Sequence, residues 1–81
     1  MNAALRLKYD PDAEALYLTL REGLAAETIE IEESVYVDLD ADERPIGVEF
    51  LDPGDLIGFL VRRGGEFVLP DRVTEPLAAA P

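Results

Sequence analysis

The strongest fold signal in the chain is Val35-Tyr36-Val37-Asp38-Leu39-Asp40-Ala41-Asp42-Glu43-Arg44-Pro45-Ile46-Gly47-Val48-Glu49-Phe50. Both ends of this stretch alternate between apolar and polar residues, which is the period of a half-buried β-strand. The mainly polar residues between them, 40–44, are typical of a hairpin loop, and Pro45 suits the first residue of a strand. The stretch therefore predicts two antiparallel strands, 35–39 and 45–50.

The same alternation extends upstream over three more segments, 5–9, 15–20 and 27–32. Asp10-Pro11-Asp12 separates the first two segments, because proline fixes its own φ and the aspartates can accept bonds from nearby backbone amides. Gly23 marks the bend before the third. These segments predict three further strands, with Ile29 and Ile31 facing the core and the intervening glutamates facing solvent.

After Phe50 the apolar period becomes helical. Asp52 is a suitable N-cap with Pro53 at the first helical position, and a stripe of Leu and Ile follows as far as Arg62-Arg63. Gly64-Gly65 ends the predicted helix. Residues 66–69 have the composition of a sixth strand, and the Pro- and Ala-rich residues 70–81 are typical of a tail.

The predicted fold class is α+β and mostly β: a five- or six-stranded antiparallel meander with one short C-terminal helix. Residues 1–65 form one domain, and residues 66–81 form a possible extra strand and a tail. A helix of about ten residues is ~15 Å long, whereas five strands span about 24 Å. The sheet would then keep an uncovered apolar area, which predicts a homodimer.

Composition excludes several classes of function. The chain has 81 residues, with 18 Asp and Glu against 7 Lys and Arg, and the net charge is −11. This charge disfavours nucleic-acid binding, which needs clustered cations. The chain lacks His and Cys, the commonest zinc ligands and catalytic bases. With no apolar run long enough to span a membrane and no secretory signal visible, we expect a cytoplasmic location without membrane contact.

The negative charge is unevenly distributed. Residues 27–55 contain eleven acidic residues and one basic residue, Arg44, which gives −10. The rest of the chain contains seven acidic and six basic residues, which gives −1. The predicted third to fifth strands and the start of the helix therefore carry almost all of the net charge.

Two motifs give the chain a family resemblance. Residues 9–18, Tyr-Asp-Pro-Asp-Ala-Glu-Ala-Leu-Tyr-Leu, and residues 37–52 together resemble the uncharacterised bacterial family catalogued as domain of unknown function 2283. The resemblance covers roughly residues 5–56, and Glu43 departs from it because the family usually has Gly in this hairpin. It implies a small β-rich domain of bacterial or archaeal origin and a loose association with toxin–antitoxin-like gene pairs. It implies no catalytic residue and no cofactor.

The acidic hairpin offers a candidate metal site. Asp38, Asp40, Asp42 and Glu49 occupy positions 1, 3, 5 and 12 of a calcium-loop spacing, and Ca²⁺ prefers hard carboxylate oxygens. Glu43 replaces the glycine of that loop, and Glu49 falls on a strand instead of a helix. The alternative is an acidic turn whose aspartates accept bonds from backbone amides.

A second candidate is a protein-binding surface on the outer face of the sheet. The residues expected there are Tyr17, Glu30, Glu32, Tyr36, Asp38 and Glu49. Opposed carboxylates on such a face can also do acid–base chemistry, but no pocket is predicted around them. We therefore interpret the chain as a non-enzymatic, antitoxin-like acidic interaction domain that binds and neutralises a basic protein partner. Its alternatives are a divalent-cation-binding domain and, more remotely, a carboxylate-based hydrolase.

Overall fold

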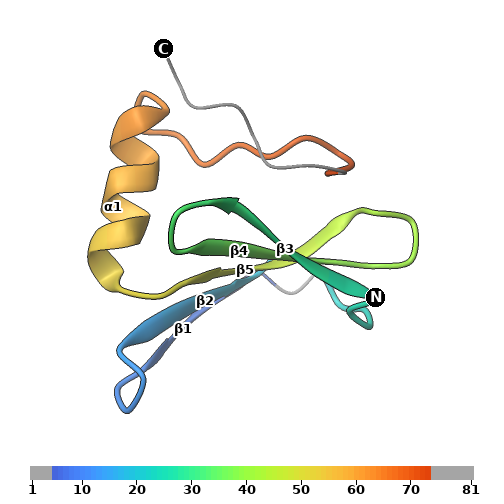
Figure 1. Ribbon diagram of the computed structural model, residues 1–81, viewed down its shortest axis with the longest axis horizontal. Helices are drawn as coiled ribbons and strands as arrows, with labels where there is room; N and C mark the ends of the chain where they lie inside the picture. Colours follow the sequence, from blue (N-terminus) through green and yellow to red (C-terminus); the bar gives the residue numbers. More distant parts are fainter. Residues whose placement is uncertain (1–4, 74–81) are drawn as a thin grey trace.

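A computed structural model of the chain describes residues 5–73 and contains one antiparallel sheet and one helix (Figure 1). The elements are β1 (Arg6–Asp10), β2 (Ala15–Thr19), β3 (Glu27–Glu32), β4 (Val35–Leu39), β5 (Pro45–Phe50) and α1 (Pro53–Arg62). The predicted α+β class, with five strands and a short helix after them, is confirmed. No helix in this part of the chain has the length and apolar character needed to cross a membrane.

The strand order differs from the predicted meander. The strands lie in the order β1-β2-β5-β4-β3, so β2 pairs with β5 instead of β3. Residues 20–26 cross to the far edge, and β2 to β5 have the order of a Greek key read from β5 backwards. This order places the most buried strand, β5, in the centre. The acidic β3 takes an edge, where charged side chains protect an exposed ladder from aggregation.

The helix begins and ends as its sequence predicts. The Asp52 carboxylate accepts a hydrogen bond from the Gly54 backbone N–H at 2.7 Å, and Pro53 occupies the first turn. At the other end Gly64 and Gly65 have φ of 72° and 86°. The Gly65 N–H bonds to the Leu60 carbonyl at 2.7 Å. This is a Schellman ending, and the left-handed φ values explain the glycine pair.

The core lies between the sheet and the helix. Buried aliphatic residues of β3, β4 and β5 form its floor, and Phe50 and Phe59 are fully buried. The ring centroids of these two phenylalanines are 5.8 Å apart in an edge-to-face arrangement, a geometry that aromatic pairs prefer. Phe59 on α1 therefore fixes the helix over β5.

Residues 66–73 are part of this core. They form no strand, so the possible sixth strand at residues 66–69 is absent. The ring centroids of Phe67 and Phe59 are 5.3 Å apart. Val73 is 2% exposed, and its backbone N–H donates a hydrogen bond to the Glu43 carbonyl at 2.9 Å. Figure 1 shows this segment on the same side of the sheet as α1. The globular unit thus extends beyond residue 65, and residues 74–81 of the predicted tail lie outside the described residues.

Candidate functional site

The outer face of the sheet, opposite α1, is set by the strand register. Lys8, Tyr17, Glu49, Tyr36 and Glu30 pair across all five strands and form one row. Since facing residues of neighbouring strands point to the same side of a sheet, their side chains share the outer face. The sheet thus brings together five of the six predicted partner-binding residues: Tyr17, Glu30, Tyr36 and Glu49 in this row, and Asp38 in the next.

Tyr17 and Asp38 bond to each other across the middle strand. The Tyr17 hydroxyl donates to Asp38 Oδ2 at 2.5 Å, and the Thr28 hydroxyl donates to Asp38 Oδ1. Gly47 of β5 lies between Tyr17 and Asp38, and a Cβ there would lie 1.9 Å from the tyrosine oxygen. The glycine therefore leaves the space that the tyrosine ring occupies. We call Tyr17, Asp38 and Thr28 the hydroxyl bridge.

The phenol of Tyr36 lies between two carboxylates. The negative charge of Glu30 raises the pKa of Tyr36, with smaller contributions from desolvation, a hydrogen bond to Glu30 and the charge of Glu49. The Glu30 carboxylate also accepts the Ser34 backbone N–H at 3.3 Å. Neither glutamate forms an ion pair within residues 5–73. We call Glu30, Tyr36 and Glu49 the acidic tyrosine site.

The strands that form this outer face belong to a segment that matches a known protein family. The family model described as "Protein of unknown function (DUF2283)" matches residues 6–52, more than half of the chain. The chain belongs to the DUF2283 family. The match runs from the first residue of β1 to the N-cap of α1, so it contains the sheet and both residue groups on its outer face. The comparisons found no curated protein and no solved structure that matches the chain.

Within the DUF2283 sheet, Glu32 does not join the outer face. The pairing of β3 with β4 shifts between Glu30 and Glu32, and a bulge of this kind redirects the side chains that follow it. Glu32 instead forms ion pairs with Arg62 and with Arg63, the latter at 2.8 Å. The prediction that Glu32 belongs to the partner-binding surface is therefore wrong. Its carboxylate attaches β3 to the end of α1.

The DUF2283 hairpin does not form the predicted cation site. Asp40 accepts the backbone N–H groups of Asp42 and Arg44 at 2.8 and 3.0 Å, and Asp42 pairs with the Arg44 guanidinium at 3.8 Å. The hydrogen bonds that Asp40 accepts, above all the one from the Arg44 backbone, lower the pKa of its carboxyl group. The Asp38 carboxylate is held by the hydroxyl bridge, away from this turn, and Glu49 lies on β5. No cluster of acidic side chains within residues 5–73 is arranged to hold a metal ion.

The hairpin is an acidic turn closed by its own backbone. Glu43 has a φ of 66°, the left-handed conformation that glycine adopts most easily. This explains physically why a glycine suits the position and why Glu43 is unusual there. The turn-forming role of Asp40, which the sequence offered as the alternative to a metal ligand, is the one that the structure supports.

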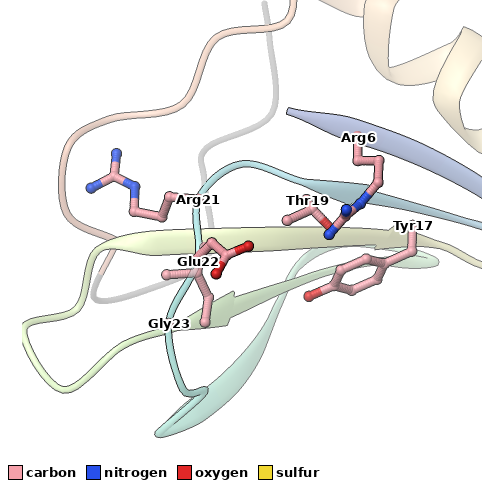
Figure 2. Close-up of a pocket in the computed structure, with 7 residues that line it drawn as sticks. Arg6, Tyr17, Thr19, Arg21, Glu22 and Gly23 are labelled. Carbon is pink, nitrogen blue, oxygen red and sulfur yellow. The ribbon is translucent and has the colours of Figure 1, made fainter. Parts of the chain in front are cut away.

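The β1 side of the outer face is basic. A hollow of about 290 Å³ is lined by Arg6, Tyr17, Thr19 and Arg21 together with Glu22, Gly23 and Ile46. Figure 2 shows these residues around it. Neither arginine forms an ion pair within the described part of the chain. Lys8 lines a second hollow, of about 320 Å³, on the other side of Tyr17. The cations Arg6 and Lys8 thus lie on the β1 side of the face, and its carboxylates lie mainly on β3 to β5.

The sequence contained part of the signal for this division. Arg6 and Lys8 alternate outward on β1, but their position relative to Glu49 depends on the pairing of β2 with β5, which is not a local property.

The two phenols on this face predict a loss of stability in alkali. Burial, the bond to Asp38 and the nearby carboxylates raise the pKa of Tyr17, and the pKa of Tyr36 is raised as well. An unfolded tyrosine ionises near pH 10, so the unfolded chain releases these protons first. The free energy of unfolding is therefore expected to be undiminished below about pH 10 and to fall above it. Urea denaturation across this range measures the effect. Tyr17→Phe should make the fall shallower.

Proposed function

We propose that this DUF2283 domain is a non-enzymatic interaction module that binds a basic protein through the β3 to β5 side of its outer face. The observation that carries the proposal is the acidic tyrosine site. Two carboxylates without a cationic partner in the described chain flank one tyrosine ring on three adjacent strands. An arginine or lysine side chain of a partner can lie against the ring and bond to both carboxylates.

The position of the site supports this role. Glu30 is exposed and Tyr36 and Glu49 are half-buried, so the ring is held while its surroundings stay accessible. Both α1 and residues 66–73 pack on the opposite face. The surrounding strands hold most of the net charge, which attracts a cationic protein over a distance and accelerates encounter. A basic protein neutralised as in a toxin–antitoxin pair fits such a surface.

A synthetic octa-arginine peptide provides a direct test by fluorescence anisotropy. Glu30→Gln with Glu49→Gln is expected to weaken binding about tenfold, the loss typical of two exposed ion pairs. The matched control is Asp12→Asn with Glu66→Gln, which removes the same charge from exposed positions elsewhere. It is expected to weaken binding less than about twofold, because distant exposed charges are screened.

Equal losses in the two double variants would show that the peptide senses net charge alone, and the proposed site would be rejected. A cellular test is co-purification of the tagged protein with the product of a neighbouring small basic reading frame. Recovery that depends on Glu30 and Glu49 is the expected result. Recovery of the tagged protein without the basic product at low salt would count against the proposal.

A further inference from the structure

A second surface of the molecule is apolar and lies apart from the acidic tyrosine site. Within residues 5–73, eight large apolar side chains are exposed, and five of them belong to β1 and its approach or to α1. We call these five the β1–α1 surface: Leu5, Leu7, Tyr9, Ile57 and Val61, with exposed fractions of 74, 54, 49, 60 and 72%.

The strand register places the β1 part of this surface beside the helix. Leu7 pairs with Leu18, and Tyr9 pairs with Leu16, which in turn pairs with Phe50. Phe50 packs against Phe59 of α1, so Leu7 and Tyr9 lie on the face that α1 covers. The helix rests on β5 and β2 and leaves β1 beyond it uncovered (Figure 1).

The helix contributes the other part. At 100° per residue, Ile57 and Val61 lie one turn apart on one side of α1. Phe59 is on the side that contacts Phe67 of the C-terminal segment. Because Ile57 and Val61 are each about 160° from Phe59 around the helix axis, they lie on the side of α1 away from that segment. Ile57 and Val61 are exposed, as are the inward side chains Leu7 and Tyr9 of β1, so α1 and the strand that it leaves uncovered both present apolar side chains to solvent.

We propose that a second copy of this chain packs on the β1–α1 surface across a two-fold axis. A typical monomer rarely exposes a contiguous apolar area of more than a few hundred Å² unless it binds something. A stable protein–protein interface needs about 800 Å² from each partner. Five large exposed apolar residues, with the half-buried Leu16 and Leu18 of β2 beside Tyr9 and Leu7, supply an apolar centre of the kind found in homodimers.

The distribution of charge favours a second copy at this place. Two chains of net charge −11 repel each other, and residues 27–55 hold −10 of it. β1 carries Arg6 and Lys8 against one acid, Asp10, and α1 with its two caps carries two acids against Arg62 and Arg63. These two elements are therefore close to neutral in an otherwise acidic protein, and two copies meet there with little repulsion.

The packing is face to face, not edge to edge. Pairing of two β1 edges about Lys8 would set Lys8 of one copy directly opposite Lys8 of the other, and like charges that face each other across strands are destabilising. Packing through the apolar face keeps these side chains in solvent. It also leaves the acidic tyrosine site of each copy free, so the dimer and the proposed partner complex are compatible.

Light scattering and sedimentation at micromolar concentration test the proposal. The expected mass is twice 8.9 kDa. Val61→Glu is expected to raise the dimer dissociation constant about tenfold or more, as for a residue near the centre of an interface. Leu24→Glu is the matched control, because Leu24 is 89% exposed on the β2–β3 connection and the added charge is the same. The control is expected to change the constant less than about twofold.

A mass of 8.9 kDa at micromolar concentration would overturn the proposal, and so would equal effects of the two substitutions. Both positions are largely exposed, so circular dichroism and the melting curve should confirm that the variants fold. Salt separates this inference from the proposed function: added NaCl is expected to weaken octa-arginine binding and to strengthen or preserve the dimer. The experiments can therefore reject the dimer without rejecting the binding of a basic partner, and the reverse.

Discussion

Gly47→Ala is expected to destabilise the protein by about 2 kcal/mol, even though alanine is normally tolerated better than glycine in a strand. The added Cβ would lie 1.9 Å from the Tyr17 hydroxyl oxygen. The backbone of β5 is fixed by pairing on both sides, so the tyrosine ring must move. Its hydroxyl then leaves Asp38, and a bond to a charged group in a half-buried place is worth about 1.5–3 kcal/mol.

A double-mutant cycle separates this cause from a general effect of the methyl group. Tyr17→Phe alone removes the same hydrogen bond and is expected to cost about 1.5–2 kcal/mol. In the Gly47→Ala background, Tyr17→Phe should cost a few tenths of a kcal/mol, because the bond is already lost. Urea denaturation of the four proteins gives the coupling. Additive losses would show that Tyr17 and Gly47 act independently and would refute the hydroxyl bridge.

Gly58→Ala is the control for alanine replacement itself. This glycine lies inside α1, where alanine favours the helix by about 1 kcal/mol. Its Cβ would approach the mobile end of the Arg62 side chain at 3.0 Å, and that side chain can shift. The same chemical change is thus expected to preserve or raise stability at residue 58 and to lower it at residue 47.

The parts of the fold that the sequence predicts correctly depend on local patterns. Alternation identifies all five strands, and the Asp52-Pro53 and Gly64-Gly65 pairs identify both ends of α1, because periodicity and capping involve residues close together in the chain. Strand order is different in kind. No residue pattern near β2 indicates that it pairs with β5. The sequence therefore predicts a meander, and the observed strand order shows that this prediction is wrong.

The errors at the candidate site have the same origin. Alternation places Glu32 outside, but the irregular pairing near Glu30 turns it to α1, where Arg62 and Arg63 are thirty residues away in sequence. The hydroxyl bridge joins β2, β4 and β3, and a glycine on β5 permits it. Such a contact becomes visible only when the strand order is known. In contrast, Glu30, Tyr36 and Glu49 lie on consecutive strands, so alternation alone placed them on one face.

Phe59→Ala is expected to be the most damaging single substitution, with a loss of about 3–5 kcal/mol, which is the usual cost of removing a buried phenylalanine ring. Phe59 is fully buried and contacts three partners. Its ring packs edge-to-face on Phe50, lies 5.3 Å from Phe67, and supports the Arg63 guanidinium 3.8 Å from the ring centre. These contacts join the sheet, the C-terminal segment and the helix end, so the cavity weakens all three attachments.

Two further substitutions test whether residues 66–73 belong to the core. Phe67→Ala is expected to cost about 2–3 kcal/mol, less than Phe59→Ala because Phe67 is half-buried. Val68→Ala, at the adjoining position, is expected to cost about 0.5 kcal/mol or less, because that side chain is 59% exposed. Thermal and urea unfolding should rank the losses in this order. If Phe67→Ala costs no more than Val68→Ala, the segment does not stabilise the sheet. The inner face over β3 to β5 would then also be available to a second copy, and the dimer surface would extend beyond β1 and α1.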